Sequence, residues 1–437
     1  MSTPTKICLP RVTLRSLPPA LFLLTYPSAS LLIPGAGSAL SVAAAIVALV
    51  LLALPQRWTD LSMRDWDRVD TAFCVCAALP VLAVLLSGVA HGQLVVSTLD
   101  SPSRFLLAAP VFLILRRSLP GTLAWTDLSF ALAALASLGI LLVIPRDWGL
   151  GRISSKFLNP IHFGDIALAM GALSVLSLNW WRKDCAAVRL VKIAGLFAGL
   201  AASVITGTRG SWVAIPVVAV MVVYLRSRGK SRKWKVVLPL AMAALLAGVY
   251  VFSSTVRARF GGVSSDLVQY MNGHKDTAMG IRLQLYEAAL RIVESHPLLG
   301  LGGDGFRNSM QAFADAGLIT PIAAQFGRGE AHNQMLAYMT DYGGIGGIAL
   351  LGIYLVPAII FWRRLGAPAV PVQRAALLGL TFVVSFWIFG LSVETFDLKL
   401  TVSFYSTVLA IIVACCTYAD RRAPHSRAAQ SSHRSNH

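Results

Sequence analysis

Apolar segments of about twenty residues recur along this 437-residue chain, separated by polar stretches that are mostly short. A transmembrane helix needs about 20 mostly apolar residues, and about twelve such segments can be marked. They lie near residues 18–35, 38–55, 71–90, 104–116, 122–144, 161–180, 189–206, 210–225, 236–254, 332–362, 374–392 and 399–419. The sequence therefore predicts an all-α polytopic membrane protein. Of these segments, 104–116 is short, and 332–362 is long enough to emerge from the membrane at one end.

The composition agrees with a membrane environment. Hydrophobic residues make up 56% of the chain and charged residues 13%, whereas soluble domains are about one quarter charged. The formal net charge is +18, from 38 Lys and Arg against 20 Asp and Glu. Such an excess is typical of basic cytoplasmic loops that lie next to anionic membrane lipids. Nucleic acid is not an expected partner, because the basic residues are scattered among many loops.

The orientation follows from Lys and Arg, which concentrate in cytoplasmic loops. The densest basic cluster, residues 226–235, falls between the eighth and ninth segments. Placing this cluster inside puts both termini in the cytoplasm. The polar stretch between the ninth and tenth segments, the long loop (residues 255–331), is then on the periplasmic side of a bacterial inner membrane. We therefore expect transmembrane helices one to nine at 1–254, the long loop at 255–331, helices ten to twelve at 332–419 and a disordered cytoplasmic tail at 420–437.

The long loop is the polar exception in an apolar chain, and loops beyond about 15 residues are usually functional or disordered. It contains a helical pattern from Ile281 to Ser295, followed by a turn rich in Pro and Gly. It ends just before His332, at the start of the tenth apolar segment. We interpret the long loop as a catalytic cap over the outer face of a membrane protein.

On this topology four polar groups converge at the outer face. Three are single residues: Arg209 between the seventh and eighth segments, Arg282 early on the loop helix, and His332. The fourth is the stretch 152–162 before the sixth segment. Arginine matches phosphate oxygens with a planar fork and stays charged, and histidine can remove a proton from a hydroxyl near neutral pH. This combination suits the transfer of a group away from a diphosphate, with His332, Arg282 and Arg209 as the catalytic residues.

Weaker candidates for substrate binding surround these three residues. They are Arg152, Lys156, Asn159, Glu330, Asn333 and Arg291. Glu330 is placed to orient the His332 imidazole. Structural alternatives remain for the others: Arg152 and Lys156 can anchor at the membrane interface, Asn333 can cap a helix, and Arg291 can pair with Glu287 or Glu294.

No metal or other cofactor is expected, because the outer face lacks a dense carboxylate cluster with metal-ligand spacing. None of the six cysteines falls in the long loop, which excludes disulfides there. Between the last two segments, Glu394, Asp397 and Lys399 are expected to pair with one another. The glycines of residues 343–347 are expected to allow close helix packing.

The chain resembles the O-antigen ligase family over roughly residues 206–347. The matching segments are Thr-Gly-Thr-Arg-Gly-Ser-Trp at 206–212, Gly-Ile-Arg at 280–282 with the following helix, Ser-His-Pro-Leu-Leu-Gly-Leu-Gly-Gly-Asp-Gly-Phe at 295–306, Ala-His-Asn-Gln-Met-Leu at 331–336 and Asp-Tyr-Gly-Gly-Ile-Gly-Gly at 341–347. The resemblance implies a metal-independent, lipid-linked glycosyltransferase working on the periplasmic face, and we expect it to invert the anomeric centre by a single displacement. The donor would be O-antigen polysaccharide on undecaprenyl pyrophosphate, and the acceptor a sugar hydroxyl of lipid A–core. The resemblance also implies His332 as the catalytic base and Arg209 and Arg282 as the arginines that bind the pyrophosphate.

Alternatives stay open on the sequence. An O-antigen polymerase and a protein O-oligosaccharyltransferase share the same superfamily and motifs. A polysaccharide flippase or other transporter belongs to a different class, and it should place ionisable groups at broken helices inside the membrane. The apolar segments are nearly free of internal charge, which favours an enzyme.

Overall fold

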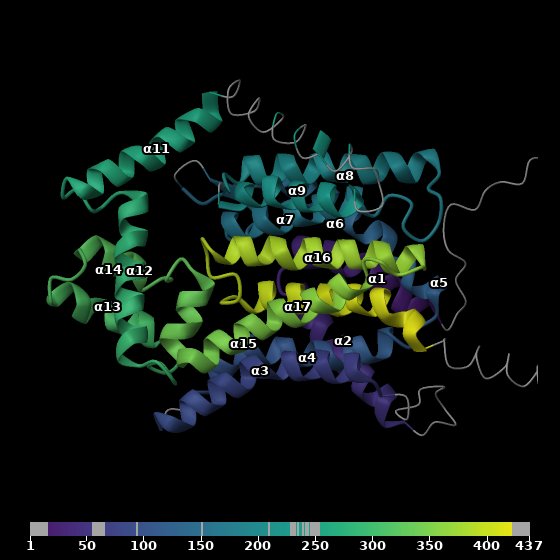
Figure 1. Ribbon diagram of the computed structural model, residues 1–437, viewed down its shortest axis with the longest axis horizontal. Coiled ribbons are helices and arrows are strands. Elements are labelled where there is room, and N and C mark those ends of the chain that lie inside the picture. Colours follow the sequence, from purple (N-terminus) through teal and green to yellow (C-terminus); the bar gives the residue numbers. More distant parts are fainter. Residues whose placement is uncertain are drawn as a thin grey trace, which may run out of the picture.

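The computed structural model describes residues 16–54, 66–92, 95–149, 152–208, 210–227 and 254–421, with scattered residues from 233 to 244. This part of the chain is almost entirely helical (Figure 1). Within it, eight helices are long and apolar enough to cross a membrane by length and composition. They are α2 (Ala36–Ala53), α3 (Arg68–Ala90), α4 (Asp100–Leu115) extended by the η3 turn (Val96–Leu99), α6 (Thr126–Val143) preceded by α5 (Pro120–Leu123), α8 (Ala186–Ile205), α15 (Gln334–Arg364), α16 (Val370–Gly390) and α17 (Lys399–Thr417).

Three shorter apolar helices accompany them: α1 (Leu17–Leu32), α7 (Pro160–Leu176) and α9 (Ala214–Ser227), the last preceded by the η4 turn (Gly210–Val213). Each expected segment coincides with a described helix except 236–254, which lies largely outside the described residues. The prediction of an all-α polytopic membrane protein is confirmed, and a total of about twelve spans stays a prediction. The expected short segment 104–116 is lengthened because η3 and α4 together run from Val96 to Leu115.

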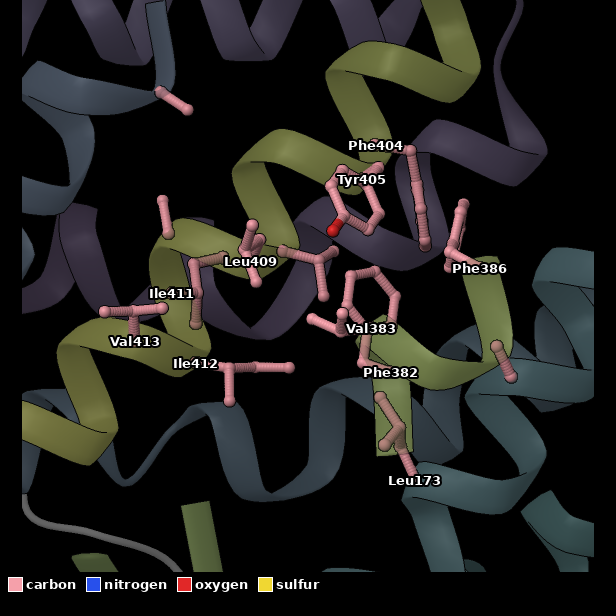
Figure 2. Close-up of a cluster of buried hydrophobic side chains, with 14 of the residues drawn as sticks. Leu173, Phe382, Val383, Phe386, Phe404, Tyr405, Leu409, Ile411, Ile412 and Val413 are labelled. Atoms are coloured by element: carbon pink, nitrogen blue, oxygen red, sulfur yellow. The ribbon is translucent and has the colours of Figure 1, made fainter. Parts of the chain in front are cut away.

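The hydrophobic core surrounds α17, whose residues from Thr401 to Thr417 are all buried. Figure 2 shows Phe404 and Tyr405 of α17 beside Phe382 and Phe386 of α16. The ring centroids of Tyr405 and Phe386 lie 4.9 Å apart. A helix that is apolar on every side belongs in the middle of a bundle, covered by other helices.

Helices α7 and α8 approach closely because small residues face each other. A methyl group added at Gly199 would lie 2.4 Å from the carbonyl oxygen of Ala167 and 2.8 Å from the Cα of Gly171. Small residues let membrane helices pack at such distances. A two-residue hairpin, β1 (Arg146–Asp147) with β2 (Ile153–Ser154), precedes α7. The packing brings the start of α7 beside the chain that follows α8, where the hydroxyl of Thr208 donates to the carbonyl of Pro160 at 2.9 Å.

The long loop forms a helical unit at one end of the bundle (Figure 1). Its helices are α11 (Ser254–Met271), α12 (Ala278–Ser295), α13 (Gly305–Asp315) and α14 (Pro321–Gly327). It has a small apolar core of its own, which includes Leu285, Met310 and Ala323. The helix predicted at 281–295 is confirmed and begins slightly earlier, because the side chain of Thr277 caps α12 by accepting from the N–H of Gly280.

Helix α15 is broken at Gly343, where φ is 65° and ψ is −155°. The turn after α12 fits into this break. The N–H groups of Leu301 and Gly302 donate to the carbonyls of Thr340 and Asp341 at 2.9 and 2.8 Å, and the N–H of Gly344 donates to Pro297 at 2.8 Å. The glycines at 343–347 therefore do more than allow helix packing, since Gly343 lets the long loop bond directly to the membrane helix. Beyond the break, residues 344–364 reach about 30 Å at 1.5 Å per residue, the thickness of one hydrocarbon core.

Two buried ion pairs correct the expectation that the apolar segments are nearly free of charge. Arg116 pairs with Asp70 at 2.8 Å, and Lys192 pairs with Asp127 at 2.7 Å, with both cationic side chains fully buried. Each charge has a partner, as the cost of an isolated charge inside a membrane protein requires. Arg116 and Asp127 flank α5, which lies at the opposite end of the bundle from the long loop in Figure 1. These charges are therefore far from the predicted catalytic residues.

Candidate active site

His332 lies in the His332 loop (residues 328–333), which joins α14 to α15. Its φ of 54° places it in the left-handed region, which is uncommon for a residue other than glycine and is often found at functional sites. Asn333 caps α15 by accepting from the N–H groups of Met335 and Leu336 at 3.0 and 3.1 Å. The side chain of Asn333 thus has the structural role that the sequence left open, and it fixes the start of the helix next to His332.

The carboxylate of Glu330 lies beside the imidazole of His332. Its Oε1 lies 2.8 Å from Nδ1 of His332, and the two side chains are only 22% and 16% exposed. A carboxylate beside Nδ1 favours the tautomer that carries its proton there, which leaves Nε2 free to accept a proton. Burial acts to raise the pKa of the Glu330 carboxyl, but His332, the charge of His162 and the N–H of Glu394 together hold this pKa below its usual value. The pair is arranged as a base and its orienting carboxylate.

Helix α12, which carries Arg282, contacts the His332 loop. Tyr286, one turn further along the same face, donates from its hydroxyl to the carbonyl of His332 at 3.0 Å and to that of Leu391 at 3.1 Å. The positive charge of Arg282 acts on this hydroxyl. Tyr286 was not singled out in the sequence, although its position four residues after Arg282 places both on one face of a helix.

Arg282 is half-buried, and its guanidinium makes no hydrogen bond or ion pair with any residue that the structure describes. Three other arginines of the long loop have partners: Arg291 pairs with Glu287 at 2.8 Å, Arg307 with Asp397 at 3.0 Å, and Arg328 donates to Gln311 at 2.7 Å. A guanidinium without such a partner can bind an anion from outside the chain.

Arg291 is not brought to this site. It follows Arg282 by nine residues, which at about 100° per residue places it on the opposite face of α12. Its exposed ion pair with Glu287 is the structural use that the sequence had offered as an alternative.

The α16–α17 turn (residues 391–398) joins several parts of the site. The buried Glu394 accepts from the N–H of Ala331, and its own N–H donates to Oε2 of Glu330 at 3.4 Å. Burial raises the pKa of the Glu394 carboxyl to about 8, although the Ala331 N–H and the charge of Arg307 favour its ionised form. Glu394 thus bonds to the His332 loop at Ala331 and Glu330, a role that the sequence did not predict.

The expected mutual pairing of Glu394, Asp397 and Lys399 is wrong. Lys399 pairs with Asp100 at 2.5 Å. Glu394 and Asp397 both pair with Arg307 of α13, at 3.4 and 3.0 Å. The long loop supplies a cation that sequence proximity could not reveal.

The segment after α8 also reaches the α16–α17 turn. A methyl group at Gly210 would lie 2.5 Å from Oγ of Ser392, and one at Gly207 would lie 3.8 Å from Cγ of Arg152. Arg209 itself lies outside the described residues. On either side of it in the sequence, Gly207 lies beside Arg152, and Gly210 lies beside the turn that contacts Glu330.

Two further candidates, Asn159 and Lys156, lie in the stretch before α7. Asn159 caps α7, accepting from the N–H groups of Ile161 and His162 at 2.8 and 3.2 Å. Lys156 is exposed, and its carbonyl accepts from Arg146 at 2.9 Å. Among the described residues, no group of three or more His, Cys, Asp or Glu side chains is arranged to hold a metal ion.

Comparisons with known proteins point to the same region. Residues 194–351 match the family model described as O-antigen ligase. An uncharacterized protein of Haemophilus influenzae is 25% identical over 295 residues, which cover 66% of this chain and 72% of that protein. An O-antigen ligase of Escherichia coli is 22% identical over 197 residues, which cover 45% of this chain and 46% of that protein. The matched range includes Arg282, the His332 loop and the break in α15. Residues 194–351 therefore match the O-antigen ligase family, and this match covers less than half of the chain.

Proposed function

We propose that this protein is an O-antigen ligase. It transfers O-antigen polysaccharide from undecaprenyl pyrophosphate to a sugar hydroxyl of lipid A–core, in the biosynthesis of lipopolysaccharide. The observation that carries the proposal is the juxtaposition of the Glu330–His332 pair with Arg282, connected by the Tyr286 hydroxyl. A base next to an arginine without a carboxylate partner suits attack by a hydroxyl with departure of a phosphate.

In the proposed reaction, Nε2 of His332 takes the proton from the acceptor hydroxyl. The oxygen forms a bond to the anomeric carbon as the bond from that carbon to the pyrophosphate oxygen breaks. The electron pair leaves with undecaprenyl pyrophosphate. Because attack and departure occur on opposite faces in one displacement, the anomeric configuration is inverted. Glu330 stabilises the imidazolium that forms, through its contact with Nδ1.

The leaving group develops negative charge on its pyrophosphate, and Arg282 is the residue placed to stabilise it. A guanidinium binds two phosphate oxygens with its planar fork. Arg209 is proposed as the second arginine, since the backbone on both sides of it lies beside Arg152 and Ser392. With two arginines available for charge stabilisation, the proposed transfer does not require a metal.

The membrane arrangement is part of the proposal. The protein is a multi-pass membrane protein, and we place it in the bacterial inner membrane with both termini in the cytoplasm. The long loop then covers the periplasmic face, where both lipid-linked substrates are present. The basic cluster at 226–235 faces anionic lipid on the cytoplasmic side.

A polymerase of the same superfamily would use the same base and arginines with a lipid-linked repeat as acceptor. The test is reconstitution of the purified protein with lipid-linked O-antigen and lipid A–core in the presence of a chelator. We expect lipid A–core to shift to high mass. Growth of undecaprenyl-linked chains alone would instead identify a polymerase, and glycosylation of an added acceptor protein would identify a protein O-oligosaccharyltransferase. Movement of the lipid-linked glycan between leaflets without a new glycosidic bond would identify a transporter.

A further inference from the structure

A cleft of about 170 Å³ opens beside the proposed catalytic residues. It is lined by residues from the start of α4, from α13, from the first turns of α15 and from the α16–α17 turn. Gln334, two residues after His332, and Glu394, which bonds to Ala331, both belong to its lining. No lining residue comes from α12, which carries Arg282. The cleft is thus adjacent to the His332 loop without including the proposed pyrophosphate site.

Two tyrosines of α15 line the cleft, and their hydroxyls have no hydrogen-bond partner in the described part of the chain. Tyr338 and Tyr342 are 7% and 8% exposed. Their rings contact each other edge to face, with centroids 5.6 Å apart. A nearly buried tyrosine usually finds a partner for its hydroxyl. Two such tyrosines at the wall of a cleft indicate that a ligand forms hydrogen bonds with their hydroxyls.

The charge of the cleft limits what that ligand can be. Its lining includes Asp304, Asp341, Glu394 and Asp397, with Arg307 among them. Arg307 is already engaged, at 3.6 Å from Asp304, 3.4 Å from Glu394 and 3.0 Å from Asp397. Even where the Glu394 carboxyl, with its pKa of about 8, holds a proton, Asp304 and Asp397 outnumber Arg307. A phosphate would therefore meet excess negative charge and no free cation in this lining. Carboxylates accept strong hydrogen bonds from hydroxyl groups, so a neutral polyol suits the cleft.

The size of the cleft points to a single ring. Pockets for drug-sized ligands measure about 300–1,000 Å³, and this cleft is smaller. We propose that the cleft binds one neutral sugar ring of a substrate glycan, with the Tyr338 and Tyr342 hydroxyls and the Asp304 and Asp397 carboxylates as its hydrogen-bond partners. This proposal rests on the proposed function and deepens it. It gives the site a sugar-binding side next to His332 and separate from the phosphate-binding side at Arg282.

The sugar ring could belong to the acceptor or to the donor, and binding experiments distinguish the two. We would add delipidated core oligosaccharide, or separately O-polysaccharide released from its lipid, to the purified full-length protein and measure binding by saturation-transfer NMR. We expect one of these probes to bind both the wild type and His332→Ala. Binding to His332→Ala does not depend on transfer. Sugar binding by the cleft can therefore be judged even if the protein is not a ligase.

The variants are chosen to remove hydrogen bonds with little change of shape. Each of Tyr338→Phe and Tyr342→Phe should weaken binding of that probe about fivefold, and the double variant by more than tenfold. Asp304→Asn, at a more exposed position, should weaken it similarly if the tyrosine variants do not fold. The matched control is Asp315→Asn, on the exposed face of the same α13 and outside the cleft, which should bind like the wild type. Absence of binding by both probes to the wild type would overturn the proposal, and so would unchanged binding in the folded variants.

Discussion

The carboxylate of Glu330 lies 2.8 Å from Nδ1 of His332, and both side chains are largely covered by the protein. The two residues are two positions apart in the sequence. Between them the chain turns so that the side chains meet, and His332 adopts a left-handed backbone conformation with φ of 54°. The backbone of this loop is further held by the Tyr286 hydroxyl and by Glu394. Because Nδ1 faces Glu330, Nε2 is the imidazole nitrogen that we propose takes the proton from the substrate.

The first prediction concerns this carboxylate. Glu330→Gln keeps the size of the side chain but removes the charge that stabilises the proton on Nδ1 and the imidazolium formed during transfer. We expect the transfer rate in reconstituted liposomes to fall on the order of 10²-fold, with the protein still folded. Glu294→Gln, at an exposed position on α12, is the control and should transfer normally. A Glu330→Gln protein with an unchanged rate would show that the carboxylate does not act on His332.

The second prediction concerns Tyr286, which connects α12 to the His332 loop. Tyr286→Phe removes the donor to the carbonyls of His332 and Leu391. Without it, His332 and Arg282 are less firmly held relative to each other. We expect the transfer rate to fall about tenfold and the free energy of unfolding to fall by about 1–3 kcal/mol. Initial rates and thermal unfolding in detergent would check both, with Tyr270→Phe on α11 as the comparison. If the rate stayed at the wild-type level, the hydroxyl would have no positioning role.

The third prediction is a pH dependence of stability that arises from Glu394. Its carboxyl has a pKa of about 8 in the folded protein, against an ordinary value of 4.5. The folded state therefore holds a proton that the unfolded state releases between these two pH values. Stability from this group is present below pH 4.5, is lost as the pH rises toward about 8, and changes no further above it.

We expect Glu394→Gln, which imitates the protonated acid, to remove this loss of stability. The thermal unfolding midpoint of the wild type should fall relative to that of the variant as the pH is raised from 5 to 8. Tryptophan fluorescence of both proteins in detergent would measure the difference. Parallel curves over this pH range would mean that Glu394 titrates as an ordinary carboxyl.

The fourth prediction tests the break in α15. A methyl group at Gly343 would lie 2.2 Å from the carbonyl carbon of Leu298, and the backbone there has a positive φ of 65°. Gly343→Ala should therefore separate the long loop from α15 and lower stability by at least about 1–3 kcal/mol. Gly139→Ala, in the middle of α6 with nothing within 4 Å of the added methyl group, should be neutral or stabilising. Equal unfolding midpoints for Gly343→Ala and the wild type would contradict the described contact.

Local patterns explain why much of the fold could be predicted. Apolar runs of membrane length correspond to described helices from α1 to α17, and the helix over 281–295 follows from its own periodicity. The juxtaposition of Arg282 with His332 was expected from their common position at one face of the membrane. These features depend on residues close together in the sequence or on a single topological rule.

The features that were missed depend on contacts between distant residues. Glu394 lies more than sixty positions from Ala331, as the hydrogen bond between them records, and its burial depends on the long loop. Asp397 pairs with Arg307 and not with Lys399, because α13, which carries Arg307, lies against the α16–α17 turn. The bonds between the 297–302 turn and the broken α15 have no periodic signal. Tyr286 could have been found from its spacing with Arg282.

The most direct test of the central claim is the rate of transfer from lipid-linked O-antigen to lipid A–core by reconstituted His332→Ala and Arg282→Ala, with chelator present. We expect losses of about 10²–10⁴-fold for His332→Ala and about 10²–10³-fold for Arg282→Ala. The controls His274→Ala and Arg291→Ala, at exposed positions on the same long loop, should transfer like the wild type. Transfer at the wild-type rate by a folded His332→Ala protein would contradict the account.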